Sequence, residues 1–207
     1  MGKPLYVLIN PRVASAAEEF AYHVQQLKLG ELIGARTAGA ANNNALVPVA
    51  PCFVLSVSRG HPVHAVSETN WEGVGIAPDV ETPPEQALEV AQSRALKKLL
   101  ANPGLTPALR SGYAWAQTTV EAGLHPVSVP ARILKPLAGR FGPNEVSWRD
   151  GALWLRRGGR PAARLTPLTA EGLFSVEGHE SLRARLTGKA LELLWSDAPE
   201  PAVFARG

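Results

Sequence analysis

The chain has 207 residues, of which 45% are hydrophobic, and a formal net charge of +3 at pH 7. This length allows one large or two small domains, and this composition supports an ordinary buried core. The single cysteine, Cys52, excludes an internal disulfide, and no apolar segment is long enough to span a bilayer, so a disulfide-rich scaffold and a membrane-spanning protein are not expected.

The positive charge is concentrated in the second half of the chain. Residues 105–207 hold 13 lysines and arginines, against 8 in residues 1–104. Four of the arginines lie close together, at Arg156, Arg157, Arg160 and Arg164. No nucleic-acid motif or interleaved aromatic residue accompanies them, so a solvated strand face is favoured over a nucleic-acid partner.

The first half alternates short strands with helices. Hydrophobic periodicity predicts strands over 5–9 and 31–35 and helices over 15–29 and 85–100. This alternation is typical of an α/β structure.

Between these elements, residues 42–44 read as a polar loop and residues 53–58 as a strand. Arg59-Gly60 is interpreted as a turn, with residues 62–66 as the returning strand of a hairpin. His61 and His64 would then be exposed hairpin residues. Cys52 precedes an apolar run and is expected to be a small buried side chain.

The second half changes character after a connecting helix predicted over 106–122, with Thr106 as its N-cap. Asp150-Gly151 is a two-residue hairpin turn between alternating runs. Glycines then separate short strands over 173–176, 182–186 and 190–195. These signals predict a small antiparallel β-barrel or sandwich.

Ser15 lies where the first strand ends and the first helix begins. Backbone N–H groups at a helix start lack intrahelical partners and can stabilise a developing negative charge, which suits a serine nucleophile. The spacing Ser15-x-x-Glu18 also fits a capping box, in which the two residues only stabilise the helix start. Local sequence leaves both interpretations open.

Four blocks in order resemble the C-terminal-processing (tail-specific) serine peptidases. They are Pro4–Asn10, Ala14–Tyr22, Ile33–Ala40 and Asn70–Val80. The resemblance covers about residues 3 to 100. It implies a serine endopeptidase with Ser15 as nucleophile, the Ala16 N–H in the oxyanion hole, and a peptide or protein substrate.

The resemblance also indicates which branch of the family is nearer. The processing branch uses a lysine where this chain has Ala40, and no lysine lies between Lys28 and Lys97. The branch that includes the tricorn core protease and the interphotoreceptor retinoid-binding protein uses a histidine base and a downstream glutamate. Glu72 falls at the place of that glutamate, although a loop carboxylate that accepts backbone N–H bonds is an equal alternative.

The histidine base of that branch lies upstream of the nucleophile, and none of the 14 residues before Ser15 is a histidine. The chain is therefore interpreted as the C-terminal portion of a longer enzyme. A catalytically silent ligand- or peptide-binding module on the same fold is the alternative, because an unassisted serine is a poor nucleophile. A truncated product that exposes apolar sheet edges is a weaker interpretation, and it leaves a homo-oligomer open.

The resemblance implies part of a layered α/β peptidase core of the ClpP/crotonase kind over residues 1–104. A helical connector over 105–128 and a small all-β domain over 129–207 would follow. No cofactor and no metal site are expected, since no carboxylate or cysteine stands at ligand spacing from His61 and His64. No signal peptide is visible; relatives often act outside the cytoplasm, and the compartment is left open.

Overall fold

The computed structural model describes residues 3–198 and 200–207, and they form two compact units. The first unit ends at Ala95 and the second spans Leu96–Gly207. Each has its own hydrophobic core, so each is described by itself. The predicted division at 104 and 128 stays a prediction.

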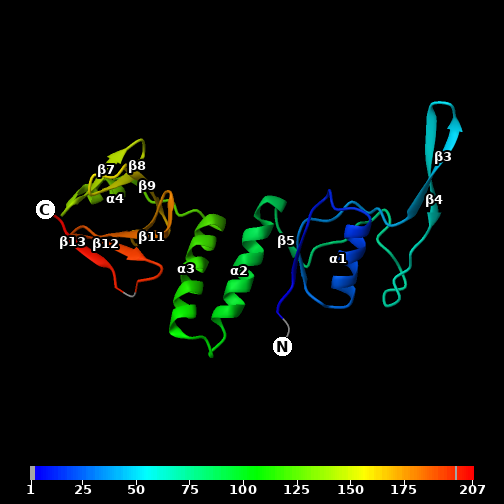
Figure 1. Ribbon diagram of the computed structural model, residues 1–207, viewed down its shortest axis with the longest axis horizontal. Helices are drawn as coiled ribbons and strands as arrows, with labels where there is room; N and C mark the ends of the chain where they lie inside the picture. Colours follow the sequence, from blue (N-terminus) through cyan, green and yellow to red (C-terminus); the bar gives the residue numbers. More distant parts are fainter. Residues whose placement is uncertain (1–2, 199) are drawn as a thin grey trace. The chain divides into compact units, whose positions relative to one another are not determined.

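A small parallel sheet with one helix packed on it forms the centre of the first unit. The strands β1 (Tyr6–Ile9), β2 (Glu31–Gly34) and β5 (Val80–Glu81) lie in the order β1-β2-β5. Helix α1 (Ala16–Gln26) connects β1 to β2 and contacts β2 (Figure 1). This strand–helix–strand unit matches the predicted α/β alternation, because parallel neighbours require such a crossover.

The core of this unit is built by the apolar face of α1 and by β1 and β2. Ala21 and Leu32 have no exposed surface, and Ile9, Val24 and Trp71 are nearly as buried. Glu18 lies on the same helix and is equally buried. A fully buried carboxylate needs hydrogen-bond donors around it.

The first unit also carries a two-stranded hairpin that differs from the predicted one. Strands β3 (Asn43–Ala50) and β4 (Phe53–Gly60) pair with each other and with no other strand of the described residues (Figure 1). Cys52 lies in the turn between them and is exposed, so its predicted burial was wrong. His64 lies outside the hairpin and is only 9% exposed, so its predicted exposure was also wrong.

The second unit begins in helix α2 (Ala87–Leu100), which the short helix η1 (Pro84–Gln86) precedes, and continues with α3 (Pro107–Leu124). Thr106 is the N-cap of α3, as predicted, and its side chain accepts a hydrogen bond from the Leu109 N–H. Lys97 and Glu121 form an ion pair between the two helices. After α3 come two short helices, α4 (Ala131–Leu134) and η2 (Lys135–Leu137).

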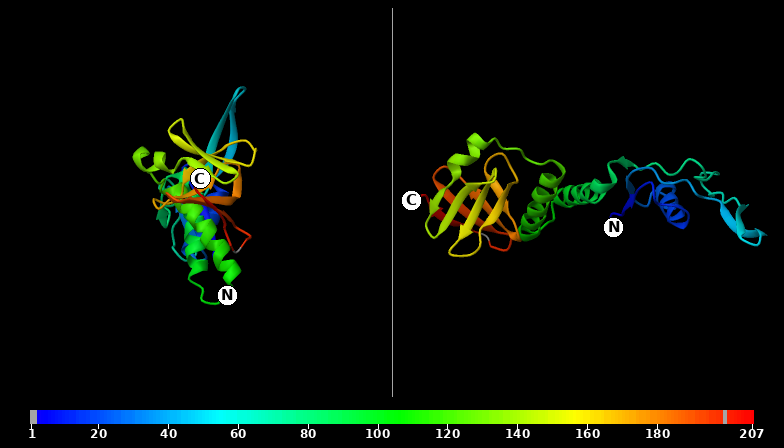
Figure 2. Two further views of the ribbon diagram at one scale, coloured as in Figure 1. Left: turned by 90° about the vertical axis from the view of Figure 1, so that its left-hand side faces the viewer. Right: turned by 90° about the horizontal axis from the view of Figure 1, so that it is seen from above.

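The rest of this unit is an eight-stranded antiparallel sheet that nearly closes into a barrel (Figure 2). Its strands run in sequence order; they are β6 (Gly139–Phe141), β7 (Asn144–Arg149), β8 (Ala152–Arg157), β9 (Ala163–Pro167), β10 (Leu173–Val176), β11 (His179–Leu186), β12 (Ala190–Trp195) and β13 (Ala202–Ala205). An antiparallel bridge from Phe141 to Arg206 joins the two ends of the sheet. The predicted small β-domain is therefore present, in its barrel-like form.

Residues that alternate along the strands fill the barrel interior. Phe141, Leu155, Phe174 and Leu191 are at most 1% exposed. The turn at Asp150-Gly151 forms as predicted, with both residues at positive φ, which a two-residue hairpin of this kind requires.

Candidate active site

Ser15 immediately precedes α1 in a strained backbone conformation. Its φ is 56° and its ψ is −127°, a combination that a residue with a Cβ rarely adopts. The surrounding structure must hold it there, because such a residue costs roughly 1–3 kcal/mol. The conformation places a serine at the N-terminal end of a helix dipole, where partial positive charge gathers.

Glu18 holds Ser15 against the loop that follows β2. Its carboxylate accepts hydrogen bonds from the N–H groups of Ser15 (3.0 Å), Gly39 (2.7 Å) and Ala40 (2.8 Å). The hydroxyl of Thr37 donates a fourth bond to it. Glu18 therefore joins the serine to the segment 37–40, which lies more than 20 residues further along the chain.

The ionisation of Glu18 reflects this arrangement. Burial by itself raises the pKa of Glu18, but the hydrogen bonds from Thr37, Ala40, Gly39 and Ser15 together outweigh it and hold the pKa below its ordinary value. The site thus contains a buried carboxylate that is ionised at neutral pH. Four donors replace the water that the charge has lost.

Glu72 holds the next part of the same loop. One of its carboxylate oxygens accepts the N–H groups of Ala41 (2.6 Å) and Asn42 (2.8 Å). Asn70 supports it, because the Asn70 side-chain oxygen accepts the Glu72 N–H at 3.0 Å. Glu18 and Glu72 between them bind four consecutive backbone N–H groups, from residue 39 to residue 42.

Two glycines allow this loop and the segment 73–76 to approach each other closely. Gly39 has a φ of 85°, and a Cβ placed on it would lie 2.8 Å from the Gly75 nitrogen. Gly75 has a φ of 65°, and its Cβ would lie 2.3 Å from the Thr37 carbonyl oxygen. The Thr37 hydroxyl accepts the Ile76 N–H across the same contact. A side chain at either glycine would force the two segments apart.

The structure thus brings together Ser15, Ala16, Glu18 and the loop over 37–42, with Glu72 at the far end of that loop. In the described residues, no hydrogen bond joins Ser15 to a histidine or a lysine. His64 contacts Tyr22 instead, with ring centroids 5.3 Å apart, and its Nδ1 accepts the Val66 N–H at 3.3 Å.

Within the described residues no cluster of histidine, cysteine and acidic side chains could hold a metal ion, and no helix is long and apolar enough to cross a membrane.

Sequence reasoning missed the extent of the Glu18 network. The spacing Ser15-x-x-Glu18 indicated the bond between Glu18 and the Ser15 N–H, which the structure contains. It could not indicate the bonds to Thr37, Gly39 and Ala40, which depend on the position of a distant loop. The sequence did contain one signal of this network, because the acidic residue Glu18 lies on the same buried face of α1 as Ala21.

Comparison with known proteins finds a family resemblance over the part of the chain that holds this site. Residues 1–82 match the profile of peptidase family S41. This part of the chain, called the S41 segment below, is therefore similar to the S41 peptidases. The matched residues include Ser15, Ala16, Glu18 and Glu72, so the whole arrangement around Ser15 lies within the S41 segment.

The chain is also similar to a solved structure, that of a photosystem II D1 C-terminal processing protease. The two share 30% sequence identity over 40% of this chain and 21% of that chain, with a TM-score of 0.33. This chain therefore aligns with about a fifth of the length of that protease. The S41 match supports a peptidase function in general terms.

Proposed function

We propose that the S41 segment carries the nucleophile of a tricorn-like serine endopeptidase acting on peptides or proteins. Ser15 attacks the scissile carbonyl, and the Ala16 N–H at the first turn of α1 stabilises the oxyanion that forms. The observation that carries this proposal is the strained backbone of Ser15 at the start of α1, inside the segment that matches S41. Strain of this kind is concentrated at functional sites.

Glu72 is proposed to orient the catalytic group that accepts the serine proton, or to position the substrate. Its carboxylate already fixes Ala41 and Asn42, so it controls the loop next to Ala40. The general base itself is proposed to come from an upstream part of a longer enzyme. We also propose that residues 1–104 are part of a layered peptidase core of the ClpP/crotonase kind.

A binding module without catalysis is the second candidate. Ala40 stands where the processing branch has its lysine, and its N–H is bound to Glu18. This position therefore supplies no base, and a serine without a base is a weak nucleophile. Stoichiometric binding of a peptide or an apolar ligand without turnover would favour this candidate.

The experiment is labelling of the chain with a fluorophosphonate and mapping of the adduct by mass spectrometry. We expect an adduct on Ser15 that disappears in Ser15→Ala. Ser58→Ala is the matched control, since Ser58 is an exposed serine of β4, and labelling of this variant should equal that of the wild type.

An adduct at other serines but not at Ser15 would contradict the nucleophile assignment. A folded chain that takes no label at all would favour the binding module. Peptide cleavage by a version extended upstream would then decide, because Ser15→Ala in that version must abolish cleavage if the assignment is right.

A further inference from the structure

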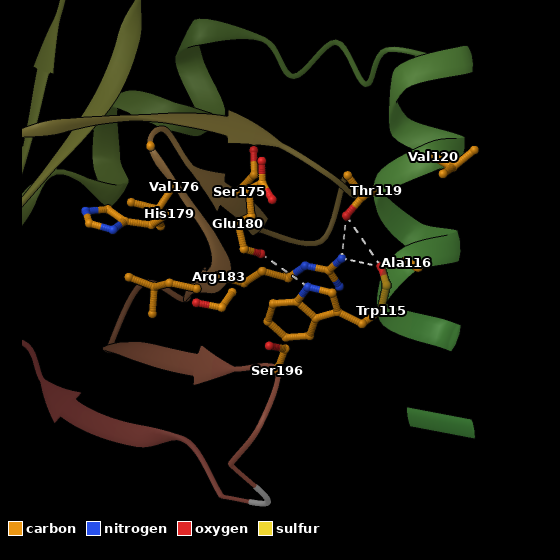
Figure 3. A pocket seen from close by; sticks show the side chains of 13 residues that line it. Trp115, Ala116, Thr119, Val120, Ser175, Val176, His179, Glu180, Arg183 and Ser196 are labelled. Carbon is orange, nitrogen blue, oxygen red and sulfur yellow. Dashed lines mark hydrogen bonds between the residues drawn. The ribbon is translucent and has the colours of Figure 1, made fainter. Parts of the chain in front are cut away.

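A pocket of about 590 Å³ lies in the second unit, between α3 and the strands β10 and β11 (Figure 3). It is far along the chain from the S41 segment and has no part in the proposed peptidase chemistry. Arg183 of β11 extends into it toward Trp115 and Thr119 of α3 (Figure 3). A volume of this size is typical of pockets that hold small organic molecules.

The Arg183 side chain is almost fully buried and is bound to helix α3 by hydrogen bonds and by a ring contact. Only 5% of its surface is exposed. Its Nη2 donates hydrogen bonds to the Trp115 carbonyl oxygen and, at 2.8 Å, to the Thr119 hydroxyl. Its guanidinium lies 3.8 Å from the centroid of the Trp115 ring, a cation–π stack.

No carboxylate compensates this buried charge within residues 3–198 and 200–207. Other arginines form ion pairs: Arg185, two positions after Arg183 on β11, pairs with Glu192. In the described residues Arg183 has no such partner. Burial lowers the pKa of Arg183 to about 10, and no neighbouring anion among the described residues counteracts that effect. Glu180 lines the pocket, but its side chain is exposed to solvent. A buried cation without a counter-ion is costly, since it has lost water and gained no opposite charge.

The guanidinium also retains unused donors. Its bonds to protein all involve Nη2, and in the described part of the chain neither Nε nor Nη1 donates to an acceptor. The remaining lining includes the apolar side chains of Ala116 and Val120 on α3 and of Val176 on β10, which lies across the pocket from them (Figure 3). Its polar side chains include Ser175, His179, Ser181 and Ser196. A ligand that complements these walls has an apolar body and one negatively charged group.

We propose that this pocket binds a small organic anion, whose carboxylate or phosphate pairs with Arg183 and whose apolar body fills the space lined by Ala116, Val120 and Val176. Charge-assisted hydrogen bonds to a guanidinium are about twice as strong as neutral ones, so the anionic group determines affinity. The pocket is thereby a second ligand site, independent of Ser15.

The test is calorimetric titration of the whole chain at pH 7 with three probes that share a phenyl group. The probes are 4-phenylbutyrate, phenyl phosphate and the neutral 4-phenyl-1-butanol. We expect at least one anion to bind about tenfold or more tightly than the alcohol. The anion that binds more tightly identifies the carboxylate or the phosphate as the natural charged group.

Variants assign the binding to the pocket. Arg183→Met keeps an unbranched apolar stem and removes the charged guanidinium, and it should weaken anion binding about tenfold or more while affinity for the alcohol changes little. Arg185→Gln is the matched control, because Arg185 lies on the same strand but is exposed and paired with Glu192. Its affinity for the anions should equal that of the wild type.

Ala116→Phe provides a second variant that leaves Arg183 in place and fills the pocket. It should abolish binding of both anions, and this test stands even if Arg183→Met does not fold. Near-UV circular dichroism would show whether Arg183→Met is folded. The proposal is overturned if the alcohol binds as tightly as both anions, if neither anion binds, or if anion binding persists in Ala116→Phe.

Discussion

Glu18 is the residue on which the geometry around Ser15 depends. It is a single carboxylate that binds the N–H of Ser15 and two N–H groups of the loop after β2. The chain from Glu18 to Ala40 is long enough that no local preference could hold these groups together. A buried anion can do so because each donor gains a charge-assisted bond in a medium that screens little.

We therefore expect Glu18→Gln to destabilise the first unit by about 2–4 kcal/mol at pH 7. The amide has one acceptor oxygen in place of two, and its NH₂ group would face backbone N–H donors. Hydrogen exchange at Gly39 and Ala40 should report the loss directly, since both N–H groups bind the carboxylate.

The pH dependence gives this prediction a sign. Because the pKa of Glu18 is lowered in the folded state, its stabilising effect is complete above the ordinary value of 4.5 and is lost as pH falls through the folded pKa. The difference between wild type and Glu18→Gln should therefore shrink in acid. Glu19→Gln, at the exposed neighbouring position, should show neither effect, and an equal loss in both variants would contradict the role of Glu18.

At the scale of helices, strands and turns, the sequence predicted the features that depend only on residues close together in the chain. The hairpin turn at Asp150-Gly151 and the cap at Thr106 need only neighbouring residues, and both are confirmed. The strand β3 was missed, because its asparagines and Pro48 disfavour a strand by composition. A two-stranded sheet tolerates the proline, since an unpaired edge requires no N–H there.

The same hairpin shows why burial was harder to predict than strand formation. The apolar run that follows Cys52 led us to expect burial there, yet Phe53 and Val54 are 68% and 61% exposed. Hydrophobic pattern shows that a segment can be buried, but not which segment covers it. The homo-oligomer that the sequence left open stays untested.

Closure of the barrel depends on the last residues of the chain. The Arg206 guanidinium donates hydrogen bonds to the carbonyl oxygens of Pro136 (2.9 Å), Ala138 (2.7 Å) and Gly188 (3.3 Å). We expect Arg206→Met to destabilise the second unit by about 1–3 kcal/mol, since bonds from a charged donor are lost. The measurement is urea unfolding, with hydrogen exchange at Gly207, whose N–H donates to the Arg140 carbonyl oxygen.

Arg164→Met is the control for this change. Arg164 is an exposed arginine of β9, a strand that lies between β8 and β10 and away from the two ends of the sheet. Its replacement removes the same charge without affecting the closure. Its unfolding midpoint should stay close to that of the wild type. If both variants lose the same stability, net charge and not the set of bonds at Arg206 accounts for the effect.

At the scale of the whole molecule, the sequence indicated two kinds of structure in one chain. The change from helix-and-strand alternation to closely spaced turns predicted a β-domain after the α/β part, and the barrel-like sheet confirms that change. The candidate site was predicted only in part. Ser15 and Glu72 could be singled out, whereas the loop over 39–42 that joins Glu18 to Glu72 exists only through tertiary hydrogen bonds.

Separate cores predict separate unfolding of the two units. Phe174 is 1% exposed and packs within the barrel core, whereas Leu32 is fully buried in the core of the first unit. Phe174→Ala should destabilise the barrel by about 3–5 kcal/mol and leave hydrogen-exchange protection in the first unit unchanged. Leu32→Ala is the reciprocal variant, expected to cost about 2–5 kcal/mol in the first unit alone. Loss of protection in both units from either substitution would mean that the chain unfolds as one cooperative structure, because independent cores cannot transmit the destabilisation from one to the other.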